Sequence, residues 1–183
     1  MPDPEQLARQ EIDALLGPCG WVIQDKKSVN LSAGRGVAVR ELTFKTGEPD
    51  YTLFVDGKAI GTIEAKPAGH SLTGVEEQSE KYVRGVPVGI PAWRSPLPFS
   101  YESTGTETRF ISRLDPVPRS RNVFGFHRPE TLLDWMDKDA RPQAVAAIAD
   151  YANRQGNFLT RIQNMPPLID DLWPPKPQAT KNI

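Results

Sequence analysis

The stretch that decides the fold is residues 50–66, which read DYTLFVDGKAIGTIEAK. Two runs rich in β-branched and aromatic residues, 51–55 and 58–65, flank the dipeptide Asp56-Gly57. This pattern predicts a β-hairpin, because Asp-Gly favours the tight turns that join antiparallel strands. Apolar residues point to both sides of these strands, so we expect a covered strand pair at the centre of a sheet.

Charged side chains stand at the open end of this hairpin. Glu64 and Lys66 are two residues apart and share one face of the second strand. A two-residue turn would place the Asp50 carboxylate on the opposite face. We therefore expect a three-residue loop over residues 55–57, which sets Asp50 opposite Thr62 and on the face of Glu64 and Lys66.

Carboxylates at this spacing can converge on one ion. Magnesium takes hard oxygen ligands and keeps several waters, so Asp50, Glu64 and the backbone carbonyl of Ala65 would form a site. The ion would polarise a scissile phosphate and lower the pKa of a bound water, while Lys66 would orient that water or stabilise the developing charge. The pattern predicts metal-dependent phosphodiester hydrolysis, with Asp50, Glu64 and Lys66 as catalytic residues. The alternative is that these are solvated charges near a strand end.

A helix is expected over residues 73–82, where Thr73 and Glu76 form a capping box. Gln78 and Tyr82 are four residues apart and lie on the same helix face. We expect them to be auxiliary or DNA-binding residues, because an amide can hold a phosphate or a metal-bound water and a phenol can contact a DNA backbone. A solvated glutamine and a half-buried core tyrosine are the alternatives.

The rest of the chain mixes helices and strands. Helix signals cover residues 3–16, 129–136 and 143–151, and strand signals cover residues 21–24, 37–44, 99–101 and 109–112. Residues 115–122 are expected to form a loop. Five prolines fall between residues 166 and 177, which is typical of a linker. We expect a nuclease domain over residues 1–165 and a proline-rich linker over residues 166–183.

Bulk composition limits the possible functions. The chain has 183 residues, 38% hydrophobic and 25% charged, which suits one compact globular domain. With a net charge of -1 it lacks the basic excess of proteins that grip DNA unaided, so we expect partners to deliver the DNA. Cys19 is the only cysteine, which excludes an internal disulfide and a thiolate metal cage. No apolar stretch of membrane-spanning or secretory type occurs, which indicates a cytoplasmic protein.

Taken together, the motifs resemble the PD-(D/E)xK nuclease superfamily, through Pro49-Asp50, then Glu64-Ala65-Lys66, then Gln78 and Tyr82. Further stretches are similar to the N-terminal nuclease domain of the restriction subunit of type I restriction-modification enzymes. These are GVAVRE at residues 36–41, YESTG at residues 101–105 and FHRPETL at residues 126–132. The resemblance covers nearly the whole chain.

This resemblance implies a restriction-endonuclease-like α/β fold, with a mixed central sheet flanked by helices. It implies double-stranded DNA as substrate, Mg²⁺ as cofactor, and the methyltransferase and specificity subunits of a type I complex as partners in a bacterial or archaeal cytoplasm. A helicase motor follows the nuclease domain in that family, so ATP would act only through the motor, and we expect this chain to be a truncated product. The resemblance also implies an acidic residue on the first helix near the metal. Glu5 is favoured over Glu11 because it shares a helix stripe with Ala8 and Ile12, and an interaction of Glu5 with the helix dipole is the alternative.

Two other interpretations stay open. The chain could be a nuclease-fold module that no longer cuts and that guides DNA or docks subunits, or an unrelated small α/β binding domain with an accidental Glu-x-Lys. His70 is expected at the surface, and His127 either binds phosphate or packs against a motor domain. A basic stretch either tracks a DNA backbone or carries solvated loop charges; it contains Arg113, Arg119, Arg121 and Arg128.

Overall fold

Seven strands form one mixed sheet in the computed structural model, which describes residues 3–72 and 81–154. The strands follow chain order: β1 (Trp21–Asp25), β2 (Gly36–Arg40), β3 (Tyr51–Val55), β4 (Lys58–Ala65), β5 (Phe99–Ser103), β6 (Thr108–Ser112) and β7 (Ser120–Val123). The pairs β1–β2 and β4–β5 are parallel, and the other neighbouring pairs are antiparallel. The predicted mixed central sheet is confirmed.

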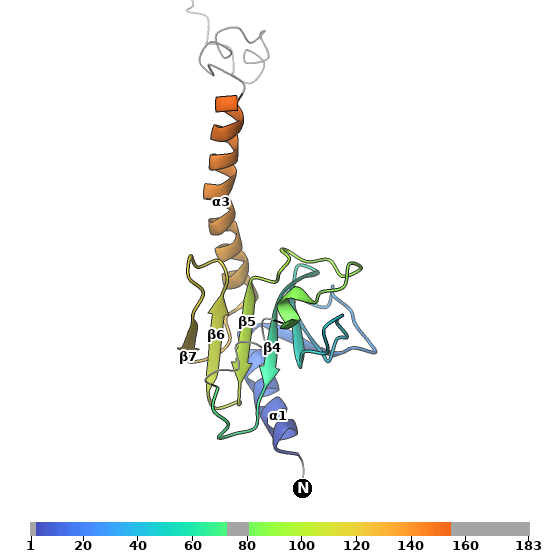
Figure 1. The fold of residues 1–183 in the computed structure, drawn as a ribbon. Helices are drawn as coiled ribbons and strands as arrows, with labels where there is room; N and C mark the ends of the chain where they lie inside the picture. The colour runs from blue at the N-terminus through green and yellow to red at the C-terminus, as the bar shows by residue number, and fades with distance from the viewer. Residues whose placement is uncertain (1–2, 73–80, 155–183) are drawn as a thin grey trace, which may run out of the picture. The chain divides into compact units, whose positions relative to one another are not determined.

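The described helical elements beside the sheet include α1 (Pro4–Leu16), the short 3-10 turn η1 (Gly17–Cys19) and α3 (Pro129–Arg154), and residues 81–84 are helical as well. Pro4 opens α1, where its missing N–H costs nothing. The chain divides into two compact units, Met1–Lys138 and Asp139–Ile183, and the first unit contains the sheet, α1 and the beginning of α3. Figure 1 shows β4, β5 and β6 side by side, with α1 next to β4. Among the described residues, no helix has the length and apolar character needed to cross a membrane.

Both faces of the central strands are covered. On one face, α1 and the start of α3 pack against β3, β4 and β5 in a core that includes Ile12, Leu16, Tyr51, Leu53, Ile63, Phe99, Leu132 and Met136. The opposite face is covered by a second core, built from Val37, Val39, Phe44, Phe54, Ala59, Val83 and Leu97. Because side chains alternate along a strand, the even-numbered residues of β3 face the second core. The predicted burial of the hairpin on both sides is confirmed.

The hairpin register differs from the predicted one. Val55 pairs with Lys58, so the turn is the two-residue Asp56-Gly57, in which both residues have positive φ (48° and 75°). The predicted three-residue loop is therefore wrong. The face of Asp50 is set by a β-bulge instead, because Leu53 pairs with Gly61 while Phe54 pairs with Ala59, which leaves Ile60 as the extra residue.

The bulge has a hydrophobic cause. Ile60 and Ile63 are three positions apart and would face opposite sides of a regular strand. The extra residue lets both side chains enter the same core, where each is fully buried. Thr52 consequently pairs with Thr62 and Tyr51 with Ile63, and continuing this register by one more pair places Asp50 across from Glu64, on one face. Asp50 thus lies opposite Glu64 and not opposite Thr62 as predicted.

Three other boundaries are corrected. The strand expected over residues 37–44 ends at Arg40, because Glu41 takes a positive φ of 50° and leaves the sheet. Part of the expected loop over residues 115–122 is strand β7, which pairs with β6 at the sheet edge. The two helices expected over residues 129–151 are one helix, α3, which continues through Pro142.

Two predicted segments fall on residues that the structure does not describe. The helix over residues 73–82 lies largely in the gap at residues 73–80, and residues 81–84 are helical. The linker over residues 166–183 and the boundary at residue 165 lie outside the described residues. The proposed domain limits therefore stay a prediction.

Candidate active site

Asp50 lies just before β3 and is held in place through both of its carboxylate oxygens. Its Oδ2 accepts a hydrogen bond of 2.7 Å from the backbone N–H of Ala65, and its Oδ1 forms an ion pair with the guanidinium of Arg9. Only 7% of the residue is exposed. In an extended strand the N–H and C=O of one residue point to the same side, so the Ala65 carbonyl is also turned toward Asp50.

Glu64 is the second buried acid of this centre, 6% exposed, and Lys66 is its nearest cation. The distance from Lys66 Nζ to Glu64 Oε2 is 3.6 Å. Glu64 Oε1 is buried and has no hydrogen-bond partner among the described residues. Burial raises the pKa of Glu64 to about 7, and the nearby Asp50 charge adds to the rise while Lys66 opposes it. Glu64 thus has one buried oxygen that could coordinate a cation without giving up a hydrogen bond to a described residue.

Tyr82 is the described member of the predicted auxiliary pair. Its pKa is raised by burial first and then by the negative charges of Glu64 and Asp50, so the phenol lies within electrostatic reach of both acids. Its ring packs on Gly47, where an added Cβ would lie 2.9 Å from Tyr82 Cε1. Gln78 lies outside the described residues.

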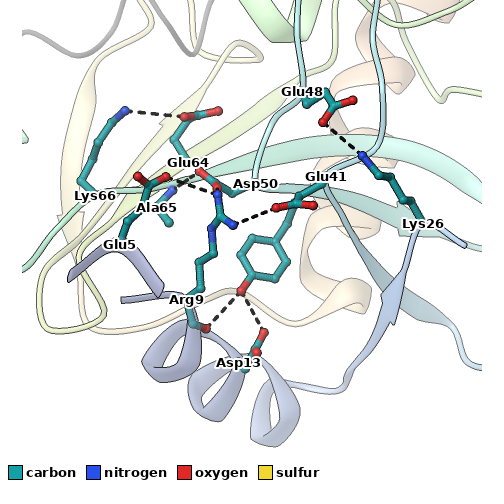
Figure 2. A network of polar contacts seen from close by, with 11 residues as sticks. Glu5, Arg9, Asp13, Lys26, Glu41, Glu48, Asp50, Glu64, Ala65 and Lys66 are labelled. Atoms are coloured by element: carbon teal, nitrogen blue, oxygen red, sulfur yellow. Dashed lines mark hydrogen bonds and ion pairs between the residues drawn. The ribbon is translucent and has the colours of Figure 1, made fainter. Parts of the chain in front are cut away.

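Sequence reasoning missed Arg9, which links helix α1 to the centre. Arg9 donates from Nη1 to Glu41 Oε1 at 2.8 Å and from Nη2 to Glu5 Oε1 at 3.3 Å, in addition to its ion pair with Asp50. Figure 2 shows its guanidinium among these three acids. The available signal was the spacing of Glu5, Arg9 and Asp13, which repeats every four residues and so marks one face of a helix.

The strand ends hold α1 against this centre. Tyr51 donates its hydroxyl toward Asp13 Oδ1 at 2.8 Å, and Arg40 Nη2 lies 2.5 Å from Asp13 Oδ2. The pKa of Tyr51 is raised by burial and by the Asp13 charge, so the phenol stays protonated and acts as a donor. Glu41, with its positive φ, donates its backbone N–H to the Asp50 carbonyl at 3.0 Å.

The predicted acid on the first helix can now be placed. Glu5 is joined to Asp50 through Arg9, which bonds to both residues. Glu11 points elsewhere, since an added Cβ at Gly105 would lie 2.7 Å from its Oε2. A role of Glu5 near a metal stays a prediction.

The donor set matches what a hard divalent cation takes. Two carboxylates, Asp50 and Glu64, stand beside a backbone carbonyl, and Glu64 Oε1 is a buried oxygen without a hydrogen-bond partner among the described residues. The hydroxyls of Thr52 and Thr62 on the same face also lack such partners in the described part of the chain. No group of three or more His, Cys, Asp or Glu side chains suited to a metal occurs there. Water and substrate would complete the coordination.

The remaining candidates lie away from the centre. His70 is exposed, and its backbone N–H donates to the Pro67 carbonyl at 3.0 Å. His127 is half-buried, with Nδ1 at 2.7 Å from the Tyr101 hydroxyl and its ring against Phe110 and Trp135, and both of its predicted roles stay predictions. Burial lowers its pKa.

The basic stretch is partly used for internal contacts. Arg113 donates to Ser100 Oγ at 3.1 Å, and Arg121 is paired with Asp115. Arg119 and Arg128 are exposed. Tracking of a DNA backbone by this stretch stays a prediction.

Comparison with known proteins decides the family. Residues 28–119 match the family described as Type I restriction enzyme R protein N terminus (HSDR_N). The chain belongs to this family. The match contains both hairpin strands and the Asp50, Glu64 and Lys66 centre, and thereby confirms the resemblance drawn from the motifs.

Two individual proteins are similar to this R-protein N-terminal domain. A solved fragment structure of an HsdR subunit of a type I restriction enzyme from Vibrio vulnificus YJ016 superposes with a TM-score of 0.50 at 16% identity, over 72% of this chain and 25% of that one. This likeness shows the fold. The SufBD family iron-sulfur cluster assembly protein ML0593 of Mycobacterium leprae is 32% identical over 99 residues, which are 50% of this chain and 11% of that protein. The chain thus spans a small part of both proteins.

Proposed function

We propose that this domain hydrolyses DNA phosphodiester bonds with a magnesium ion held by Asp50, Glu64 and the backbone carbonyl of Ala65. The observation that carries the proposal is the pairing of two almost fully buried carboxylates across the central hairpin, with one Glu64 oxygen lacking a partner among the described residues. Burying two acids side by side is unfavourable unless cations join them. A divalent ion would remove that cost.

The metal ion and the surrounding side chains would have separate roles in the hydrolysis. The bound ion would supply Lewis-acid polarisation of a phosphate oxygen and a water of lowered pKa. Glu64 has to be ionised to take part; burial raises its pKa to about 7, and a bound cation would favour the ionised form. Lys66, 3.6 Å from Glu64, offers an ammonium that can orient the attacking water or offset charge developing on the phosphate. Tyr82, on which the charges of Glu64 and Asp50 act, would contact the DNA backbone, with Gln78 proposed beside it.

The wider setting follows from family membership. We infer that the domain is one part of a larger cytoplasmic R subunit, with a helicase motor that uses ATP, and that it works with methyltransferase and specificity subunits on double-stranded DNA. The chain's net charge of -1 fits a cutter to which other parts feed the DNA. Tight binding of duplex DNA by the isolated chain at physiological salt would contradict this division of labour.

One observation favours a second candidate, a module that guides DNA or docks subunits without cutting. Both oxygens of Asp50 are already engaged, by Arg9 and by the Ala65 N–H. A centre that had lost its metal could be held together in this way. Metal binding separates the two candidates.

The test is a calorimetric titration of the full chain with MgCl₂ and MnCl₂, combined with cleavage of supercoiled plasmid. We expect binding and nicking in the native chain and loss of both in Asp50→Asn. Asp56→Asn is the matched control, because Asp56 belongs to the same hairpin but lies in its exposed turn, where asparagine also accepts a positive φ. Metal binding that survives Asp50→Asn, or an absence of binding in the native chain, would refute the proposed function.

A further inference from the structure

Arg9 is ion-paired with Asp50, the carboxylate that the proposed metal would have to coordinate. Its guanidinium is paired with Asp50 Oδ1, while Asp50 Oδ2 is used by the Ala65 N–H (Figure 2). A divalent cation and a guanidinium on one carboxylate oxygen repel each other and compete for the same lone pairs. We propose that Arg9 is the resident counter-ion of this centre, and that a divalent ion binds Asp50 only by displacing it. This inference rests on the proposed metal-dependent function.

The surroundings of Arg9 are suited to displacement. Two further acids, Glu5 and Glu41, bond to its terminal nitrogens, and their side chains are 44% and 46% exposed, against 7% for Asp50. A guanidinium that leaves Asp50 therefore keeps two anchors on the exposed side of the centre. Arg9 Nε is buried and has no hydrogen-bond partner among the described residues, so one donor of the fork is unused in the present position.

The ion pairs of Asp50 and Glu64 affect both the stability of the centre and its affinity for a metal. Arg9 is ion-paired with Asp50, and Lys66 lies 3.6 Å from Glu64. This pairing stabilises the acids against mutual repulsion and desolvation. The same pairing weakens metal binding, because the ion has to break a charge-assisted pair before it can coordinate. Arg9 therefore sets the metal affinity of the centre without being one of its ligands.

The experiment measures manganese binding to the full chain by the electron paramagnetic resonance signal of the free ion. We expect Arg9→Met to bind manganese about tenfold more tightly than the native chain, since a hydrogen-bonded charge pair no longer has to be broken. Arg40→Met is the matched control, because Arg40 pairs with Asp13 on the same helix and is absent from the contacts of Asp50. It removes an equal charge and should change the affinity by less than about twofold.

The outcomes distinguish this inference from the proposed function. Unchanged or weaker binding in Arg9→Met, with binding intact in the native chain, overturns the counter-ion role alone. An equal gain in Arg40→Met also overturns it, since the effect would then be one of net charge. Absence of manganese binding in every variant overturns the metal centre and this inference together. If Arg9→Met does not fold, as judged by circular dichroism, Arg9→Lys decides. Lysine keeps the charge but not the fork, so a gain of about threefold is expected and no gain refutes the role.

Discussion

Replacing Glu64 with glutamine should stabilise the metal-free protein while destroying its proposed activity. Glu64 is 6% exposed, and its Oε1 has no hydrogen-bond partner among the described residues. Desolvation and the charge of Asp50 both oppose its ionised form. A neutral amide of nearly the same shape relieves both effects, so the loss of a functional group is accompanied by a gain in stability.

The size of the gain follows from the pKa. The side chain titrates near 7 in the folded protein against an ordinary value of 4.5, and about 1.4 kcal/mol per pH unit converts this difference to about 3 kcal/mol. Because the folded pKa is raised, the native state carries no penalty from Glu64 below pH 4.5 and is destabilised as the pH rises through about 7. The advantage of Glu64→Gln should therefore be below about 1 kcal/mol at pH 5 and approach about 3 kcal/mol at pH 8.

The assay is urea unfolding of the native chain and the variant at both pH values with EDTA present. Glu107→Gln is the control, since Glu107 lies on the surface with a side chain 47% exposed, and its substitution should change the free energy of unfolding by less than about 0.5 kcal/mol at either pH. In a parallel series without EDTA, added manganese should stabilise the native chain and leave Glu64→Gln unaffected. Equal stability of Glu64→Gln and the native chain at pH 8, or a difference that does not grow with pH, would refute the reasoning.

Two further substitutions test other parts of the centre. Lys66→Met removes the cation 3.6 Å from Glu64, so plasmid cleavage should fall by about 100-fold or more, and retention within threefold would show that the ammonium is dispensable. Gly61→Ala places a Cβ 2.8 Å from the Phe99 carbonyl and should cost about 2 kcal/mol or more in urea unfolding, because β4 and β5 would have to separate. Gly125→Ala, where a Cβ meets nothing within 4 Å, should cost less than about 1 kcal/mol, and similar losses in both variants would contradict the steric explanation.

Local sequence was sufficient for the hairpin and for the shared face of two of the three predicted catalytic residues. Asp56-Gly57 supplies the positive φ values of a tight turn, and the β-prone runs on either side of it coincide with the observed strands, although the loop was predicted one residue too long. The two-residue period of a strand alone places Glu64 and Lys66 on one face. These features depend on residues close in the chain, whose conformational preferences can be predicted from a single turn or strand.

The position of Asp50 was decided by packing. Its face depends on the bulge at Ile60, and that bulge exists because Ile60 and Ile63 both enter a core completed by α1 and α3, from opposite ends of the described chain. Hairpin chemistry carries no information about those distant partners. The predicted three-residue loop therefore placed Asp50 on the correct face of the sheet, but for the wrong structural reason.

The sequence by itself determined the family, the place of the turn at Asp56-Gly57 and the shared face of Glu64 and Lys66, because short-range periodicity and motif spacing depend only on the order of residues. Tertiary structure alone decided that Asp50 faces Glu64, that both are buried, and that Arg9 reaches them from another element. The physical reason is that burial and ion pairing depend on which segments meet in space. Those meetings are fixed by the core as a whole and not by any stretch of the chain.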